Sequence, residues 1–370
     1  MTAAVRRHLE GPMMHRQMIR RVAVLAAAAL LATACGDAAT GGAGDGGPGG
    51  GGVEAGAEIS MARATWDTGF MQAAIYQQLL DELGYEVTDP AEETREPETF
   101  YPALARGDLH LWANGWFPLH EPFLETELVT GQRVSEPIEP VGDQVPAGAV
   151  QGYLVDAATA EELDITSMDD FTRDEVVEAF DQDGDGKADL YGCNEGWGCN
   201  LAIEDHLAEL EWGDSVEQVV GDYSELMAEA EQRVADGEPT LYYTWTPNWT
   251  VDVLVPGEDV VWVESDPLPD EDDPTEVEGL EGCAGDDPCE LGWVVNDIRA
   301  VANSELLDEH PPVRRLLEQV EIPLDDIAEQ NARMNAAEEY TEQDIQADAE
   351  DWIEANRELV DEWLTTARDG

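Results

Sequence analysis

Hydrophobic positions along the chain recur with two periods, one typical of strands and one typical of helices. After a predicted strand at residues 58–66, apolar side chains recur every four residues on one helical face, at Met71, Ile75, Leu79 and Leu83. Gly84 then ends the predicted helix, and residues 85–87 begin another strand. A strand–helix–strand opening predicts a parallel sheet covered by helices.

The same alternation continues to the C-terminus and predicts the α/β class. Further strands are expected at residues 109–113, 152–155, 241–244 and 260–263. Helices are expected at residues 201–210 and around Trp352 to Trp363. The acidic, proline-containing segment 265–290 is predicted to be a solvated loop.

The first 57 residues have the pattern of an export signal followed by a tether. Arginines precede the thirteen apolar residues 22–34, a run too short to span a bilayer of about 30 Å but typical of a signal peptide. Thr33 and Ala34 before Cys35 resemble a lipoprotein cleavage box, although Ala32 stands where leucine is usual. We therefore expect a signal peptide at 1–35, lipidation of Cys35 and a glycine-rich tether at 36–57. The alternative is ordinary cleavage nearby.

The location that follows is outside the cytoplasm, at the cell surface or in the periplasm, with a lipid anchor to the membrane. After residue 36 the sequence has no apolar stretch of transmembrane length.

Composition narrows the classes of partner. The chain has 370 residues, 43% of them hydrophobic, with 83 acidic and 18 basic residues and a formal charge of −65. A surface this negative repels nucleic acid and anionic lipid. The same excess of acid is compatible with a surface adapted to high salt, where screening removes the self-repulsion.

The four remaining cysteines form two pairs, each six positions apart. They are Cys193, Cys199, Cys283 and Cys289. Export permits disulfides, and although four cysteines allow three pairings, short loops lose the least entropy on closure. Two local disulfides are therefore expected, and the first encloses Trp197.

Several of the eleven tryptophans stand where strands are predicted to end. Trp352 and Trp363 lie on the predicted amphipathic helix and are expected in the core. By contrast, loops contain Trp116, Trp197, Trp245 and Trp249. Aromatic rings at the carboxyl ends of strands point toward the crevice where α/β proteins bind ligands, so the pattern favours a ring-lined site over separate loop plugs.

Such a site in a negative protein would attract a poorly hydrated cation such as a quaternary ammonium group. Because each cation–π contact contributes about 0.5 to 2 kcal/mol, the ligand needs a second anchor. The backbone N–H groups of Gly198 and Cys199 lie just before the helix expected at 201–210, where a carboxylate can dock. His120 is a candidate donor to the same carboxylate, its alternative being a purely structural histidine.

Four segments closely resemble one known family. They read WFPLH (116–120), DQDGDGKADLYGCNEGWGC (181–199), YYTWTPNWTVDVLVPGEDVVW (242–262) and IPLDDIAEQNARMNAAE (322–338). They resemble the ProX-like substrate-binding proteins of ABC importers for glycine betaine and proline betaine, in matching order from about Ala62 onward.

The resemblance implies a fold, a ligand and a site. The implied fold is the two-lobed periplasmic-binding-protein fold of type II with a hinge, lobe 1 being 58–148 plus 297–370 and lobe 2 being 149–296. It implies a box of Trp116, Trp197 and Trp245 around the ammonium head. It also implies that His120 and the amides of Gly198 and Cys199 hold the carboxylate beside a disulfide. The implied partners are a betaine and ABC permease subunits, for osmoprotectant uptake.

Two features depart from the family pattern. The role of the Cys283–Cys289 loop stays open, because not every member has a counterpart. Trp66, at the end of the first predicted strand, either adds a wall to the pocket or packs in the core.

The segment 181–189 looks like the first nine positions of an EF-hand loop. Its oxygen ligands would be Asp181, Asp183, Asp185 and Asp189. Position twelve is Gly192 where a bidentate glutamate is usual, so a structural calcium would bind weakly. The alternative is an Asp/Gly turn that satisfies its own backbone. No other cofactor is expected.

Three alternatives to a betaine receptor stay open at this point. They are a receptor for choline or carnitine, a secreted enzyme acting on a choline-like substrate, and a calcium-dependent adhesion protein. The sequence has neither a Gly-x-Ser-x-Gly elbow nor a His-Glu-x-x-His motif, which disfavours the enzyme.

Overall fold

The computed structural model describes residues 56–269 and 274–369, which belong to one folded unit. The predicted signal peptide, Cys35 and nearly all of the predicted tether lie outside the described residues. Within the described part, no helix is long and apolar enough to cross a bilayer.

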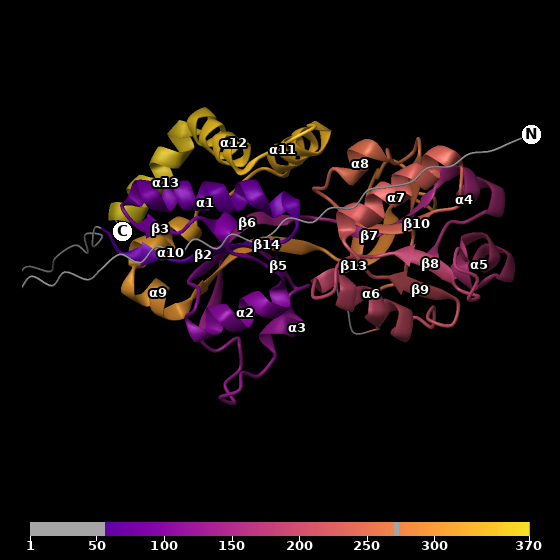
Figure 1. The fold of residues 1–370 in the computed structure, drawn as a ribbon, viewed down its shortest axis with the longest axis horizontal. Coiled ribbons are helices and arrows are strands. Elements are labelled where there is room, and N and C mark those ends of the chain that lie inside the picture. The colour runs from indigo at the N-terminus through magenta and orange to yellow at the C-terminus, as the bar shows by residue number, and fades with distance from the viewer. Residues whose placement is uncertain (1–55, 270–273, 370) are drawn as a thin grey trace, which may run out of the picture. The chain divides into compact units, whose positions relative to one another are not determined.

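Two five-stranded sheets organise the fold (Figure 1). The first has the order β4-β2-β5-β14-β6, built from Thr94–Arg95, Met61–Ala64, Leu111–Phe117, Asn296–Asn303 and Ile138–Ala149. The second has the order β11-β7-β10-β8-β9, built from Val260–Val263, Gln151–Asp156, Leu241–Trp245, Ala188–Tyr191 and Val216–Val219. Two small sheets pair β1 (Glu58–Ile59) with β3 (Glu86–Val87) and β12 (Pro274–Val277) with β13 (Cys289–Val294).

Both large sheets are mixed, whereas the sequence predicted a parallel sheet. The opening strands do pair in parallel, β2 with both β4 and β5. However, β14 returns from far along the chain and lies antiparallel between β5 and β6. In the second sheet β7 is antiparallel to both of its neighbours. Local periodicity identifies strands but carries no signal for the direction of a partner so distant in sequence.

Helices cover the sheets and account for the continuous burial of the central strands. The helices are α1 (Phe70–Leu83), α2 (Pro97–Arg106), α3 (Glu121–Leu124), α4 (Ala157–Leu163), α5 (Asp174–Phe180), α6 (Gly198–Glu209), α7 (Tyr223–Asp236), α8 (Thr250–Val253), α9 (Ser304–Glu309), α10 (Pro311–Leu317), α11 (Leu324–Ala336), α12 (Glu342–Ala355) and α13 (Arg357–Asp369). Short 3-10 turns occupy Asp67–Gly69, Pro90–Glu92 and Met168–Thr172. Helix α1 packs on β2 and β5, and α7 packs on β8 and β10. Every residue of β7, β8 and β10 is buried, as expected of strands covered on both faces.

The first predicted helix is confirmed. It ends at Gly84, whose φ of 101° lies in the left-handed region that favours glycine. The predicted C-terminal helix is instead two helices, α12 and α13, separated at Asn356. The Asn356 side chain donates to the carbonyl of Trp352, which caps the end of α12. As predicted, Trp352 and Trp363 are buried, with stacked rings 6.3 Å apart.

The segment 265–290 is not only a loop. It contains β12, which pairs antiparallel with β13, and Cys283 is joined to Cys289 at the start of β13. The alternation of Thr275, buried, with Glu276, outward, is the period of a strand, and it was obscured in the sequence by the surrounding acidic residues.

Candidate functional site

Four tryptophan side chains line one small cavity. They are Trp66, Trp116, Trp197 and Trp245, each at most 6% exposed. Ring centroids lie 5.4 Å apart for Trp66 and Trp197, 6.0 Å for Trp197 and Trp245, and 6.5 Å for Trp116 and Trp245. All three pairs are edge to face, so the rings surround a space rather than filling it as a stack. The cavity has a volume of about 30 Å³, enough for a small ligand group.

The rings come from both large sheets. Trp116 lies in β5 of the first sheet, and Trp66 lies in the turn that follows β2 of the same sheet. Trp197 precedes α6, and Trp245 is the last residue of β10 in the second sheet. Strand β5 extends beyond the predicted residues 109–113 and includes Trp116. A β-bulge shifts the register between β5 and β14, so that Trp116 pairs with Ile298 and Trp112 with Val301, which point to opposite faces of the sheet.

His120 lies beside the cavity with its protonation state determined by its neighbours. Its ring Nδ1 accepts a hydrogen bond of 3.1 Å from the backbone N–H of Trp116 and lies 2.9 Å from the hydroxyl of Tyr101. A backbone N–H can only donate, so Nδ1 carries no proton. Burial lowers the pKa of His120 to about 3. The neutral ring therefore carries its proton on Nε2, as a hydrogen-bond donor.

Helix α6 places free backbone donors at the same cavity. It begins at Gly198, three residues earlier than predicted, so the amides of Gly198 and Cys199 are the first two of the helix itself. The first N–H groups of a helix have no partner within it, and among the described residues no other group accepts from these two. The helix dipole adds positive potential at this end.

Glycine is required at position 198 for this approach. A Cβ there would lie 2.8 Å from Leu119 Cγ and 3.1 Å from His120 Cδ2. Only a residue without a side chain lets the start of α6 reach His120. The disulfide between Cys193 and Cys199 closes the short loop that holds Trp197 just before the helix.

The structure thus brings together at one cavity all the residues predicted to contact a ligand. These are Trp66, Trp116, His120, Trp197, Gly198, Cys199 and Trp245. Their role as ligand contacts stays a prediction. Trp249, also noted in the sequence, is buried but does not line this cavity, and its backbone N–H donates to Asn331 Oδ1.

Other residues at the cavity had not been predicted. Leu119, Gln151 and Tyr243 also line it, and the Tyr243 hydroxyl donates to Gln151 Oε1 at 2.6 Å. Among the described residues, nothing accepts from the buried Gln151 Nε2. A glutamine at the start of an apolar strand was the available signal for Gln151. Tyr243, within an aromatic run, offered none.

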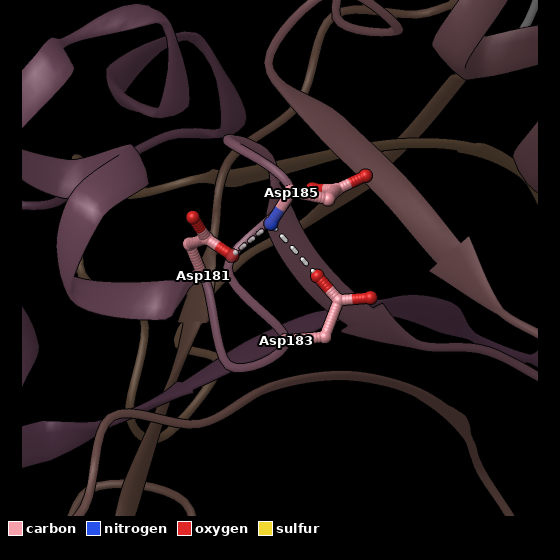
Figure 2. A group of neighbouring side chains, drawn as sticks. All are labelled: Asp181, Asp183 and Asp185. Atoms are coloured by element: carbon pink, nitrogen blue, oxygen red, sulfur yellow. Dashed lines mark hydrogen bonds between the residues drawn. The ribbon is translucent and has the colours of Figure 1, made fainter.

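The predicted calcium loop lies away from this cavity. One carboxylate oxygen from each of Asp181, Asp183 and Asp185 lies within 4.8 Å of the other two, but Asp189 is not part of this group (Figure 2). The Asp185 N–H donates to both Asp181 and Asp183, and Asp181 also accepts from the N–H groups of Gly184 and Gly186. The hydrogen bonds of a self-satisfied Asp/Gly turn are therefore present, and calcium binding stays a prediction.

Comparison with known proteins identifies the family. Residues 57–355 match the family described as the substrate-binding domain of ABC-type glycine betaine transport systems. The chain belongs to this family.

Curated relatives of this glycine betaine transport family cover most of the chain. The glycine betaine-binding periplasmic protein OusX of Dickeya dadantii is 34% identical over 315 residues, 85% of this chain and 90% of its own. The glycine betaine/proline betaine-binding periplasmic proteins of Escherichia coli and Salmonella typhimurium are 33% and 32% identical, each over 84% of this chain and 90% of their own.

Solved structures show that the fold is that of the family's binding proteins. A ProX protein of Borrelia burgdorferi has a TM-score of 0.61 at 15% identity, over 84% of this chain and 100% of its own. A choline-binding protein in complex with choline has a TM-score of 0.60 at 17% identity, covering 83% and 91%. Lactococcal OpuAC, closed around glycine betaine, has a TM-score of 0.58 at 15% identity, covering 83% and 99%.

Proposed function

We propose that this chain is an extracytoplasmic receptor that binds glycine betaine or proline betaine in the tryptophan-lined cavity and delivers it to an ABC permease. The proposal rests on one observation. The cavity combines four indole walls with neutral hydrogen-bond donors, and none of its described lining residues carries a formal charge while His120 is neutral.

The indole walls suit the quaternary ammonium end. The face of an indole ring is negative, and it attracts a cation whose charge is spread over methyl groups with little hydration to lose. At about 0.5 to 2 kcal/mol per contact, four rings contribute roughly 2 to 8 kcal/mol before desolvation. Micromolar binding needs about 8 kcal/mol, so the acid end must contribute as well.

The donors suit the carboxylate end. His120 Nε2–H and the amides of Gly198 and Cys199 lie at the same cavity, and each can donate to a carboxylate oxygen. The Gln151 amide is a further donor that has no partner in the described part of the chain. A zwitterion satisfies both ends and brings no net charge into a buried site, where an unpaired charge is costly.

The same donors weigh against the alternative ligands. Choline has the ammonium head but no acid, so it would leave buried donors unsatisfied, at about 1 to 3 kcal/mol each. Carnitine has both ends, but its chain is longer than the small cavity favours. All three curated relatives are named as binding proteins for glycine betaine, and two of them also for proline betaine. These names support a betaine as the ligand.

We assign the delivery step by analogy with the relatives. Residues 58–148 with 297–370 would form lobe 1 and residues 149–296 lobe 2, closing about the crossings at Val150 and Val294–Asn296. Closure around the ligand would exclude water, strengthen the cation–π contacts and present a loaded receptor to the permease. The relatives are periplasmic, which supports export, and Cys35 would carry the lipid anchor. Osmoprotectant uptake is the physiological role that follows.

Calorimetric titration of the purified chain tests the proposal. Glycine betaine and proline betaine should bind at micromolar concentration or tighter, with choline, carnitine and proline each at least ten-fold weaker. Mass spectrometry of the recovered ligand distinguishes a receptor, which returns it intact, from an enzyme that acts on a choline-like substrate. Tightest binding of choline, or conversion of the ligand, would contradict the proposal.

A further inference from the structure

One buried side chain holds two walls of the cavity. The amide oxygen of Asn114 accepts the indole N–H of Trp66 at 2.7 Å and that of Trp116 at 2.9 Å. Asn114 is 1% exposed and lies in β5 two residues before Trp116. The two rings, one from the turn after β2 and one from β5, are thereby tied to a single atom.

The chemistry of the partners determines which way the Asn114 amide points. An indole N–H can only donate, so the group that receives two of them must be the oxygen. Asn114 Nδ2 then donates to the side-chain oxygen of Gln72, which also accepts from the Gln144 amide. Gln72 Nε2 donates to the carbonyl of Thr68 at 3.0 Å. This buried chain keeps the Asn114 oxygen facing the indoles.

We propose that Asn114 is a positioning residue for ammonium recognition: it holds Trp66 beside Trp116 as a fourth wall and makes both ring faces more attractive to a cation. An N–H that donates to an oxygen is polarised, and its electron density shifts back into the ring. Because ring faces attract cations through their negative charge, the polarised indoles attract the ammonium head more strongly. This inference rests on the proposed binding of a betaine.

The role has a specific signature, because Asn114 lies behind the rings and does not itself line the cavity. Its loss should weaken recognition of the positive charge more than recognition of shape or of the carboxylate. The probe that separates these is 3,3-dimethylbutyrate, which has the shape and acid of glycine betaine but carbon in place of the quaternary nitrogen. The ratio of the two affinities measures the contribution of the positive charge.

The variant Asn114→Leu removes the acceptor and keeps the branching and the number of heavy atoms of the side chain. We expect calorimetry to show that the preference for glycine betaine over 3,3-dimethylbutyrate falls about five- to thirty-fold, as expected for one or two weakened cation–π contacts. The matched control is Asn303→Leu. Asn303 is another buried asparagine of the first sheet, bonded to Leu104 and Glu305 rather than to an indole. It should lower the melting temperature and leave the preference unchanged. An equal loss of both ligands in Asn114→Leu would overturn the proposal.

Two further measurements keep the test decisive. Asn114→Asp retains oxygens for both indoles, so its preference should equal or exceed that of the wild type; a fall would overturn the proposal even where Asn114→Leu does not fold. Indole N–H resonances of the ligand-free protein, assigned with Trp66→Phe and Trp116→Phe, should both move upfield in Asn114→Leu. Unmoved resonances would also overturn it. If the wild-type chain binds no betaine, the proposed function fails, while these resonances still decide whether Asn114 holds the rings.

Discussion

The indole N–H of Trp197 donates a hydrogen bond of 2.7 Å to the side-chain oxygen of Thr65. Thr65 follows β2 of the first sheet, and Trp197 directly precedes α6, which packs on β9 of the second sheet. Trp197 therefore lines the cavity and, through its indole N–H, links the segment before α6 to the segment after β2. In the lobe closure proposed above, a residue in this position would couple occupation of the cavity to the closed arrangement.

Removing the Thr65 hydroxyl should speed ligand release. Thr65→Val keeps the side-chain shape and deletes the acceptor, so glycine betaine affinity should fall about two- to ten-fold, as expected for one hydrogen bond. Stopped-flow tryptophan fluorescence should place most of the change in the dissociation rate. Thr172→Val, which loses an exposed hydroxyl bonded to the Asp169 carbonyl, serves as the control. A dissociation rate equal to that of the wild type would contradict the link.

Loss of an indole ring from the cavity should weaken glycine betaine binding more than loss of the Thr65–Trp197 hydrogen bond. Trp197→Leu removes one ring from the cavity, and calorimetry should show glycine betaine affinity reduced at least ten-fold, from lost cation–π contact and apolar burial. Trp352→Leu is the matched control, because Trp352 packs on Trp363 between α12 and α13. It should lower the melting temperature without changing affinity. Unchanged affinity in Trp197→Leu would count against the tryptophan box.

A methyl group at position 198 should separate the two carboxylate anchors. In Gly198→Ala the new Cβ meets Leu119 and His120, so the start of α6 must move away from His120. We expect glycine betaine affinity to fall about ten-fold or more, since charge-assisted hydrogen bonds depend strongly on geometry. Choline, which has no carboxylate, should lose less. Gly221→Ala, whose Cβ would make an ordinary 3.5 Å contact with Leu226, is the control. Equal losses for both ligands would exclude an effect specific to the acid end.

His120 should not make ligand affinity depend on pH between 8 and 5, because its pKa is lowered to about 3 and it keeps its Nε2 proton without gaining a second one. Stability should behave differently. Burial also lowers the pKa of His206 to about 4, so between these values and pH 6.5 only the unfolded chain gains protons on the two histidines. Their contribution to the free energy of unfolding therefore decreases as the pH falls below 6.5.

The carboxyl group of Asp67 opposes this trend. Burial raises the pKa of Asp67 to about 6, so Asp67 contributes stability that grows as the pH falls from 6 toward 3.8. Melting temperatures measured from pH 7 to 4 for wild type and His206→Gln test the balance, and the variant should lose less on acidification. An affinity that changes ten-fold with a midpoint near 6.5, and still does so in Asp67→Asn, would show that His120 titrates normally.

Calcium at the Asp181 loop remains a prediction with a direct test. Without a glutamate at position 192, the dissociation constant should be no tighter than roughly 10⁻⁴ to 10⁻³ M, the range of weak extracellular sites. Asp183→Asn keeps an oxygen for the Asp185 N–H but removes one charge, and it should abolish the heat of calcium binding while preserving the fold. If calorimetry detects no heat of binding for the wild type at millimolar calcium, the loop is an Asp/Gly turn without a calcium site.

Much of the site could be predicted because its residues stand in short, distinctive segments. Two such segments are recognisable without coordinates. They are the loop between Cys193 and Cys199 that contains Trp197, and the WFPLH segment with Trp116 and His120. Helix α1 was equally accessible, since its period and the Gly84 terminus are local properties. In contrast, the two-helix C-terminus was missed because one capping asparagine interrupts an otherwise continuous amphipathic pattern.

The sequence by itself determined the strand and helix candidates, the two short disulfide loops and the kinds of side chain available to hold a zwitterion. Only the tertiary structure decided that β14 inserts antiparallel beside β5, that Thr65 meets Trp197, and that Asn114 bonds both Trp66 and Trp116. Thr65 and Trp197 are 132 positions apart, and the paired residues of β5 and β14 are farther apart still. These contacts depend on strand order and on how the sheets approach one another, and periodicity within a segment carries no information about either.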